Sequence, residues 1–199
     1  MKNLLFIFLI SISFTQWGVK NQITERYENG KPKVVLKLKG SGLNEIMLGK
    51  ETFYKNGKLR SKSTYNSKGE KDGKWVKYII NSDLKNIPDF NVYFLHYEKN
   101  YKNGLLDGLS LIYQERTGYP YQKKNYKKGK LDGEYIRYCN IHPKKCKEMI
   151  NVIGHYKNGY KSGVWNYYHC TSAHDGDCST TIYKTEKYKL GELIEKNEY

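Results

Sequence analysis

The chain has 199 residues, of which 35 are Lys or Arg and 20 are Asp or Glu, so its formal charge is +15. Aromatic residues make up 15% of the chain, including 20 Tyr, which excludes intrinsic disorder because disordered chains are poor in aromatics. With only 4 Pro and 18 Gly, the composition also excludes collagen-like and proline-rich proteins. We expect a folded, basic protein with few aliphatic residues for a thick core.

The first fifteen residues have the layout of a secretory signal peptide. Lys2 precedes an apolar run from Leu4 to Ile10, and small residues follow up to Thr15. The run is shorter than the roughly 20 residues that span a bilayer. We predict a signal peptide over 1–15 and an exported mature chain over 16–199, in the periplasm, on the outer surface or secreted. A buried apolar strand or an uncleaved anchor stays open as an alternative.

The rest of the chain is an internal repeat. Four segments share a Tyr, two glycines four residues apart, and a second Tyr five positions after the second glycine. These positions are Tyr65/Gly69/Gly73/Tyr78, Tyr101/Gly104/Gly108/Tyr113, Tyr126/Gly129/Gly133/Tyr138 and Tyr156/Gly159/Gly163/Tyr168. Partial copies begin at Tyr27, Tyr54 and Tyr188. The register of the four copies predicts one supersecondary unit repeated along the chain.

Turn residues indicate that each unit is a β-hairpin. Asn-Gly pairs occur at 29–30, 56–57, 103–104 and 158–159, and Asn-Gly favours the type I′ turn, which needs positive φ at both central residues. The second glycine of each unit suits a bulge or another position of positive φ. The runs 74–80 and 133–138 are rich in aromatic and β-branched residues, as strands are. The fold class is therefore predicted as all-β, an elongated antiparallel sheet of stacked hairpins.

A further aromatic position follows the second glycine by two residues. It holds Trp75, Tyr135 or Trp165, while Ser110 breaks the pattern. Because side chains alternate along a strand, these aromatics should share one face and the second Tyr of each unit should lie on the other. Trp75, Tyr135 and Trp165 are candidates for binding a protein partner, and packing within the sheet is the competing role.

The repeat resembles the bacterial MORN-repeat-variant family, whose units have the pattern Tyr-x-x-Gly-x-x-x-Gly-x-Trp-x-x-Tyr. The resemblance covers most of residues 27–191 and implies an elongated sheet of successive hairpins. It also implies a protein- or membrane-attachment role, and family members often carry an antitoxin label. The second glycines here are 35, 25 and 30 residues apart, longer than the family's unit. The extra residues predict inserted loops near 81–91, 139–151 and 169–181.

All four cysteines fall in two of these insertions. Cys139 and Cys146 follow one repeat, and Cys170 and Cys178 occupy the equivalent place in the next. In an exported chain an even count favours disulfides, so we predict local bridges within each pair. Crossed pairing, free thiols and a zinc site that includes His142, His169 and His174 stay open. We predict no metal and no cofactor, since Asp175 and Asp177 supply too few oxygens for calcium.

The sequence holds no constellation typical of an enzyme. It has no Gly-x-Ser-x-Gly elbow, no phosphate-loop context and no His-Glu-x-x-His motif. His96 lies in a strand-like run with no obvious acid or nucleophile beside it. A single-layer sheet also offers few concave pockets. We expect a protein without catalytic activity.

Lysine clusters are the remaining functional signal. The clusters place Lys123 beside Lys124, Lys127 beside Lys128, and Lys144 beside Lys145. They suit an anionic lipid or glycan, whereas nucleic acid is not expected for an exported protein; a merely solvated surface is the alternative. Our first hypothesis is a protein-binding or scaffold module with an unknown protein partner. The alternatives are an antitoxin-like protein that binds a toxin directly and a peripheral binder of anionic membrane or glycan. The oligomeric state is not predicted.

Overall fold

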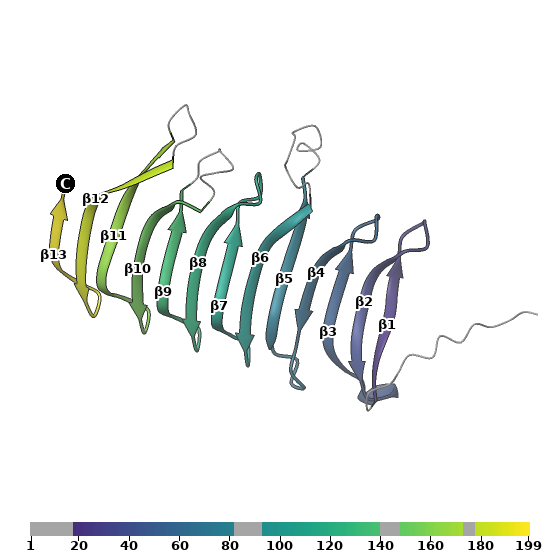
Figure 1. Cartoon of the computed structure of the whole chain (residues 1–199). Coiled ribbons are helices and arrows are strands. Elements are labelled where there is room, and N and C mark those ends of the chain that lie inside the picture. The colour runs from purple at the N-terminus through teal and green to yellow at the C-terminus, as the bar shows by residue number, and fades with distance from the viewer. Residues whose placement is uncertain (1–17, 82–92, 140–147, 173–177) are drawn as a thin grey trace, which may run out of the picture.

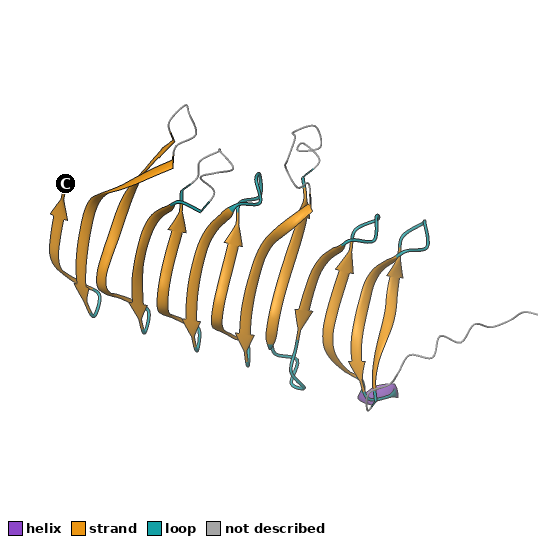
Figure 2. Ribbon diagram, viewed as in Figure 1, coloured by secondary structure: helices purple, strands orange, loops and turns teal. Residues whose placement is uncertain are grey.

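The computed structural model describes residues 18–81, 93–139, 148–172 and 178–199. These residues form one antiparallel sheet of thirteen strands, in which every strand pairs with its neighbours in the chain (Figure 1). Figure 2 shows the sheet as a single layer with its turns along two opposite edges. The predicted fold class, an elongated all-β sheet of consecutive hairpins, is confirmed.

The strands have lengths from six to thirteen residues. Their bounds are β1 Val19–Arg26, β2 Pro32–Lys39, β3 Ile46–Phe53, β4 Leu59–Thr64, β5 Gly73–Ile80, β6 Tyr93–Lys102, β7 Leu105–Tyr113, β8 Pro120–Lys127, β9 Lys130–Tyr138, β10 Ile150–Lys157, β11 Tyr160–Ser172, β12 Cys178–Lys189 and β13 Glu192–Glu198. A 3₁₀ helix, η1, spans Gly42–Asn44 between β2 and β3. No helix among the described residues is long and apolar enough to cross a bilayer.

The Asn-Gly pairs form hairpin turns of two kinds. Asn103 and Asn158 have φ of 48° and 50°, and the glycine after each is also at positive φ, so type I′ turns are confirmed there. At 29–30 and 56–57 only the glycine has positive φ, and the prediction of a type I′ turn is wrong. The amide of Tyr27 bonds to the carbonyl of Lys31 instead, which closes a three-residue loop with a glycine bulge at the opposite edge of the sheet.

The second glycine of each unit has positive φ, as predicted, with values of 71–115°. The Asp that precedes it has a role that the sequence did not indicate, because its carboxylate bonds to the next turn along the edge. The backbone N–H groups of Asn103, Lys128 and Asn158 donate these bonds to the carboxylates of Asp72, Asp107 and Asp132, respectively, at 3.0–3.1 Å. Three of the four repeats therefore hold the turn of the next repeat in this way, whereas the fourth has Ser162 in place of the Asp.

The predicted insertions are only partly loops. β11 continues to Ser172 and β12 begins at Cys178, so most of the loop predicted over 169–181 is strand. β10 begins at Ile150, inside the loop predicted over 139–151. The insertion near 81–91 lies almost entirely outside the described residues, as does the predicted signal peptide. Long strands at 169–181 follow from cross-strand pairing, which the repeat spacing alone does not reveal.

Candidate binding surfaces

One face of the sheet carries two clusters of aromatic rings. In the first, Trp75 lies between Tyr65 and Tyr101, with ring centroids 5.3 and 5.4 Å apart. The second cluster joins Tyr135, Tyr156, Trp165 and Tyr188, with centroid distances of 5.0–6.5 Å. Ser110 stands between the clusters, because it pairs with Lys99 on one side and Lys124 on the other. The predicted aromatic row is thus present, but it is interrupted where the pattern breaks.

Both indoles donate a hydrogen bond to a carbonyl of the preceding strand. The bonds are Trp75 Nε1 to Thr64 O (2.9 Å) and Trp165 Nε1 to His155 O (3.2 Å). Trp165 is only 2% exposed, whereas Trp75 is half-buried. The residue before the acceptor is Gly154 beside Trp165 and Ser63 beside Trp75, and a Cβ on Gly154 would lie 2.2 Å from the indole. Trp165 therefore packs the sheet and has almost no surface for a partner.

A buried carboxylate joins β11 to β12 beside Trp165. Glu186 is 8% exposed and accepts hydrogen bonds from the hydroxyls of Tyr167 and Tyr188 and from Lys184 Nζ. Burial raises the pKa of Glu186, but these hydrogen bonds outweigh burial and lower the pKa to about 2. Lys161 lies 4.5 Å from the Trp165 ring. The carboxylate is thus satisfied within the chain, and we assign this cluster to stability.

The predicted pair of Lys123 and Lys124 does not form one patch. Lys123 makes an ion pair with Glu134 at 2.7 Å. Neighbouring residues on a strand point to opposite faces, so Lys124 lies on the other side of the sheet. Burial, with a smaller effect of Lys99, lowers the pKa of Lys124. Lys144 and Lys145 lie outside the described residues.

Lys127 and Lys128 belong to a basic hollow at the turn edge of the sheet. The hollow has a volume of about 410 Å³ and lies between the β8–β9 turn and the β10–β11 turn. It is lined by Lys127, Lys128, Lys130, Asp132, Lys157 and Asn158. The sequence clusters suggested Lys127 and Lys128, but Lys157 joins them only because consecutive turns lie side by side. We call this feature the turn-edge hollow.

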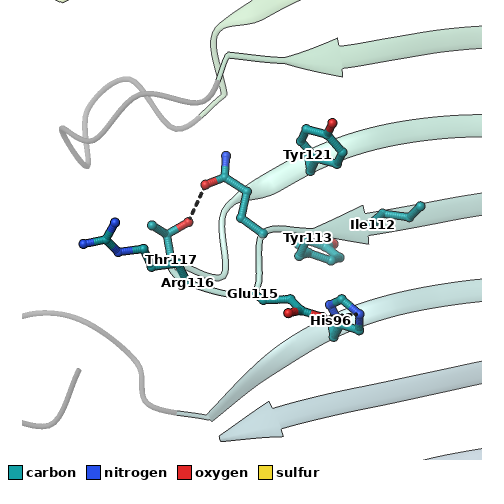
Figure 3. Close-up of a pocket in the computed structure, with 8 residues that line it drawn as sticks. His96, Ile112, Tyr113, Glu115, Arg116, Thr117 and Tyr121 are labelled. Carbon is teal, nitrogen blue, oxygen red and sulfur yellow. Dashed lines mark hydrogen bonds and ion pairs between the residues drawn. The ribbon is translucent and has the colours of Figure 1, made fainter. Parts of the chain in front are cut away.

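A second pocket, of about 650 Å³, surrounds His96 at the opposite edge (Figure 3). Glu115 Oε1 lies 3.3 Å from His96 Nε2, so the expectation that no acid stands beside His96 is wrong. Burial lowers the pKa of His96, while Glu115 acts in the other direction. The hydroxyl of Thr117 donates to Gln114 Oε1 at 2.8 Å rather than to the imidazole. The pocket thus pairs a histidine with an exposed acid, without an activated hydroxyl.

The disulfide differs from the predicted pairing. Cys139 is bonded to Cys170, 31 residues away, with a Cα–Cα distance of 5.8 Å. The predicted bridges to Cys146 and Cys178 are therefore wrong for both of these cysteines. β10 lies between β9 and β11 in the sheet, but it begins only at Ile150. Beyond this end of β10, Cys139 after β9 and Cys170 on β11 come together, and they occupy equivalent positions of consecutive repeats.

The bridge removes Cys139 and Cys170 as zinc ligands, because a metal needs the free thiolate. Among the described residues, no three His, Cys, Asp or Glu side chains gather into a possible metal site. Cys146 lies outside the described residues. A disulfide of this kind is typical of proteins in oxidising compartments.

Exposed apolar side chains gather toward the C-terminal end of the sheet. Of the twelve large apolar residues that are exposed in the described part of the chain, seven come from positions 160–199. They are Tyr160, Val164, Ile182, Leu190, Leu193, Ile194 and Tyr199. Every residue of β13 is exposed, and among the described residues β13 pairs with β12 alone. One end of the sheet therefore combines an open backbone edge with apolar side chains.

Comparison with known protein families, curated proteins and solved structures finds no match. The resemblance to the MORN-repeat-variant family therefore stays a prediction.

Proposed function

We propose that this chain is an exported, non-enzymatic repeat protein that serves as a protein-binding or scaffold module. The observation that carries the proposal is the open strand β13, where Leu193 is 50% and Ile194 54% exposed. An unpaired strand edge presents a row of backbone donors and acceptors that an extended segment of another protein can pair with. The Cys139–Cys170 disulfide supports export, because such bonds persist in oxidising compartments.

The partner that fits this end is an extended segment with apolar side chains. Backbone pairing to β13 would supply affinity, and contact with Leu193 and Ile194 would supply specificity. Charges of β13 are already complemented within the sheet, since Glu195 stands opposite Lys187 and Lys196 makes an ion pair with Glu198 at 2.7 Å. Apolar contact and backbone pairing are therefore the interactions still available. An antitoxin-like role would be one instance of this binding mode, in which the partner is a toxin.

Site-specific photo-cross-linking tests the proposal. A cross-linker at Ile194 of the full-length protein, in the cells that make it, should capture one specific protein other than a second copy of this chain. The control is a cross-linker at Leu43, which is more exposed than Ile194 (106% against 54%), lies toward the other end of the sheet and should capture nothing specific. The identity of the captured protein distinguishes a toxin from another partner. Cross-links only between copies of this chain, or the same products from both positions, would overturn the proposal.

A strand-blocking variant provides a second measurement. Leu193→Lys with Ile194→Lys places charge on the open edge, as natural sheets do to prevent pairing. Capture through a linker at Tyr199 should be lost, while the far-ultraviolet circular dichroism spectrum stays unchanged. Undiminished capture by the folded variant would contradict docking on β13.

A further inference from the structure

The turns of the repeat units carry lysines in a line. In each of four consecutive turns the residue after the repeat Tyr is an exposed lysine. These are Lys102, Lys127, Lys157 and Lys189. The turns lie along one edge of the sheet (Figure 1), and two strands separate each turn from the next. With strands about 4.8 Å apart, the cations repeat at about 10 Å along this edge.

The turn-edge hollow interrupts an otherwise continuous row of contacts between turns. In the flanking turns, the residue after the turn glycine covers the glycine of the next turn. These contacts are Leu105 against Gly129 (3.5 Å) and Tyr160 against Gly191 (2.9 Å), measured to a Cβ placed on the glycine. Lys130 occupies the equivalent position, yet a Cβ on Gly159 would have no described atom within 4 Å. The hollow lies where this covering contact is not made.

The hollow is positively charged after its own ion pair is counted. Four lysines and one carboxylate line it. The carboxylate of Asp132 is already engaged, because it accepts the Asn158 amide at 3.0 Å and lies 3.4 Å from Lys157 Nζ. Lys127, Lys128 and Lys130 remain exposed. Their ammonium groups are therefore free to meet an anion from outside.

We propose that the turn-edge hollow binds one anionic sugar unit of a linear acidic polysaccharide. The polysaccharide chain would follow the line formed by Lys102, Lys127, Lys157 and Lys189. The volume of about 410 Å³ falls in the range of small-molecule sites and exceeds what a single small ion fills. The flanking lysines would meet charges on neighbouring units of the same chain. This inference goes beyond the protein-binding role, and it uses a different part of the molecule.

The shape of the edge favours a linear polymer over a membrane. The molecule is a single layer, so its turn edge presents a line of charge and not a broad plane (Figure 2). A flat bilayer would engage a wide basic face, whereas Lys123 and Lys124 point to opposite faces of the sheet. The disulfide is typical of exported proteins, for which glycans are the expected polyanions.

Binding of size-defined oligogalacturonate, measured by titration calorimetry at low and high salt, tests the proposal. A heparin-derived oligosaccharide distinguishes sulfate from carboxylate recognition. The variant Lys127→Gln with Lys130→Gln should bind about tenfold more weakly, since two charge contacts are lost. The control Lys55→Gln with Lys58→Gln removes the same charge from a turn at the opposite edge and should bind like the natural chain.

A third variant distinguishes the contribution of the hollow's shape to binding from the contribution of its charge. Lys130→Leu copies Leu105 of the preceding turn, which covers the next glycine. It should weaken binding more than Lys130→Gln, because it also fills the hollow. If Lys127→Gln with Lys130→Gln and the opposite-edge control weaken oligosaccharide binding equally, the attraction is to net charge alone, and the proposal is overturned. Binding only to vesicles of anionic phospholipid, or no binding to either oligosaccharide, would also overturn it.

Discussion

The two aromatic clusters show how one repeat pattern produces two degrees of burial. Around Trp75 the cluster holds three rings and the indole is half-buried; around Trp165 it holds four rings and the indole is 2% exposed. Both tryptophans follow the second glycine by two positions and bond to the preceding strand in the same way. The motif therefore orients the ring, and its neighbours decide how deeply it lies.

The deciding neighbour is the residue two positions before the repeat Tyr of the preceding strand. Small residues at this position accompany large aromatics, and long ones accompany smaller partners. The pairs are Ser63 with Trp75, Lys99 with Ser110, Lys124 with Tyr135 and Gly154 with Trp165. Only Gly154 lets an indole lie directly on the backbone of the neighbouring strand, so the second cluster closes around it.

The largest expected difference between the clusters comes from removing each indole. Trp165→Ala should lower the free energy of unfolding by about 3–5 kcal/mol, as for a buried large aromatic. Trp75→Ala should cost about 2 kcal/mol, because less of its surface is removed from water. Urea unfolding followed by circular dichroism measures both. Equal losses would contradict the assignment of Trp165 as the better packed ring.

Removing the disulfide should destabilise the part of the sheet that holds the second aromatic cluster, since only this part carries the bond among the described residues. The bond between Cys139 and Cys170 closes a long loop, so Cys139→Ser with Cys170→Ser should cost roughly 3–4 kcal/mol by chain entropy. Peptide mapping without reduction should find these two cysteines linked. A peptide that links Cys139 to Cys146 would instead restore the local pairing.

Exchanging the deciding neighbour should transfer the looser packing from one cluster to the other. Gly154→Ser installs the residue found beside Trp75, and its Cβ would displace the Trp165 ring, at a cost of about 2 kcal/mol. Trp165 fluorescence should shift toward that of an exposed indole, measured in a background with the other tryptophans changed to Phe. The control is Gly49→Ala, where a Cβ would lie 3.2 Å from Ser63 O and no described indole atom lies within 4 Å. An unmoved emission maximum would refute the close contact.

The smallest expected effect is a pH dependence specific to the second cluster. The pKa of Glu186 is lowered to about 2 in the folded chain from an ordinary value of 4.5. Its stabilisation is therefore complete above about pH 4.5 and is lost as the pH falls toward 2. We expect about 1–2 kcal/mol, because solvent screens part of the cluster. In Glu186→Gln this acid-dependent part should disappear, and an unchanged pH profile would refute the assignment.

Much of the fold was predictable because its determinants are local. Asn103-Gly104 and Asn158-Gly159 specify type I′ turns by backbone conformation alone, and strand alternation places Trp75, Tyr135 and Trp165 on one face. The candidate sites were less predictable. Lys123 and Lys124 are neighbours in sequence yet lie on opposite faces, and Lys157 joins Lys127 across thirty residues of chain. The compensation between Gly154 and Trp165 is visible in the sequence, because each lies at a fixed position of its repeat unit.

The sequence by itself determined that this protein is a sheet of consecutive β-hairpins. The turn glycines and the aromatic strand residues that specify a hairpin lie within a few positions of one another in the chain. Only the tertiary structure decided that Cys139 meets Cys170, that Glu115 stands beside His96, and that four turn lysines line one hollow. These contacts depend on which repeats lie next to each other and on where each strand ends. Both are properties of the assembled sheet.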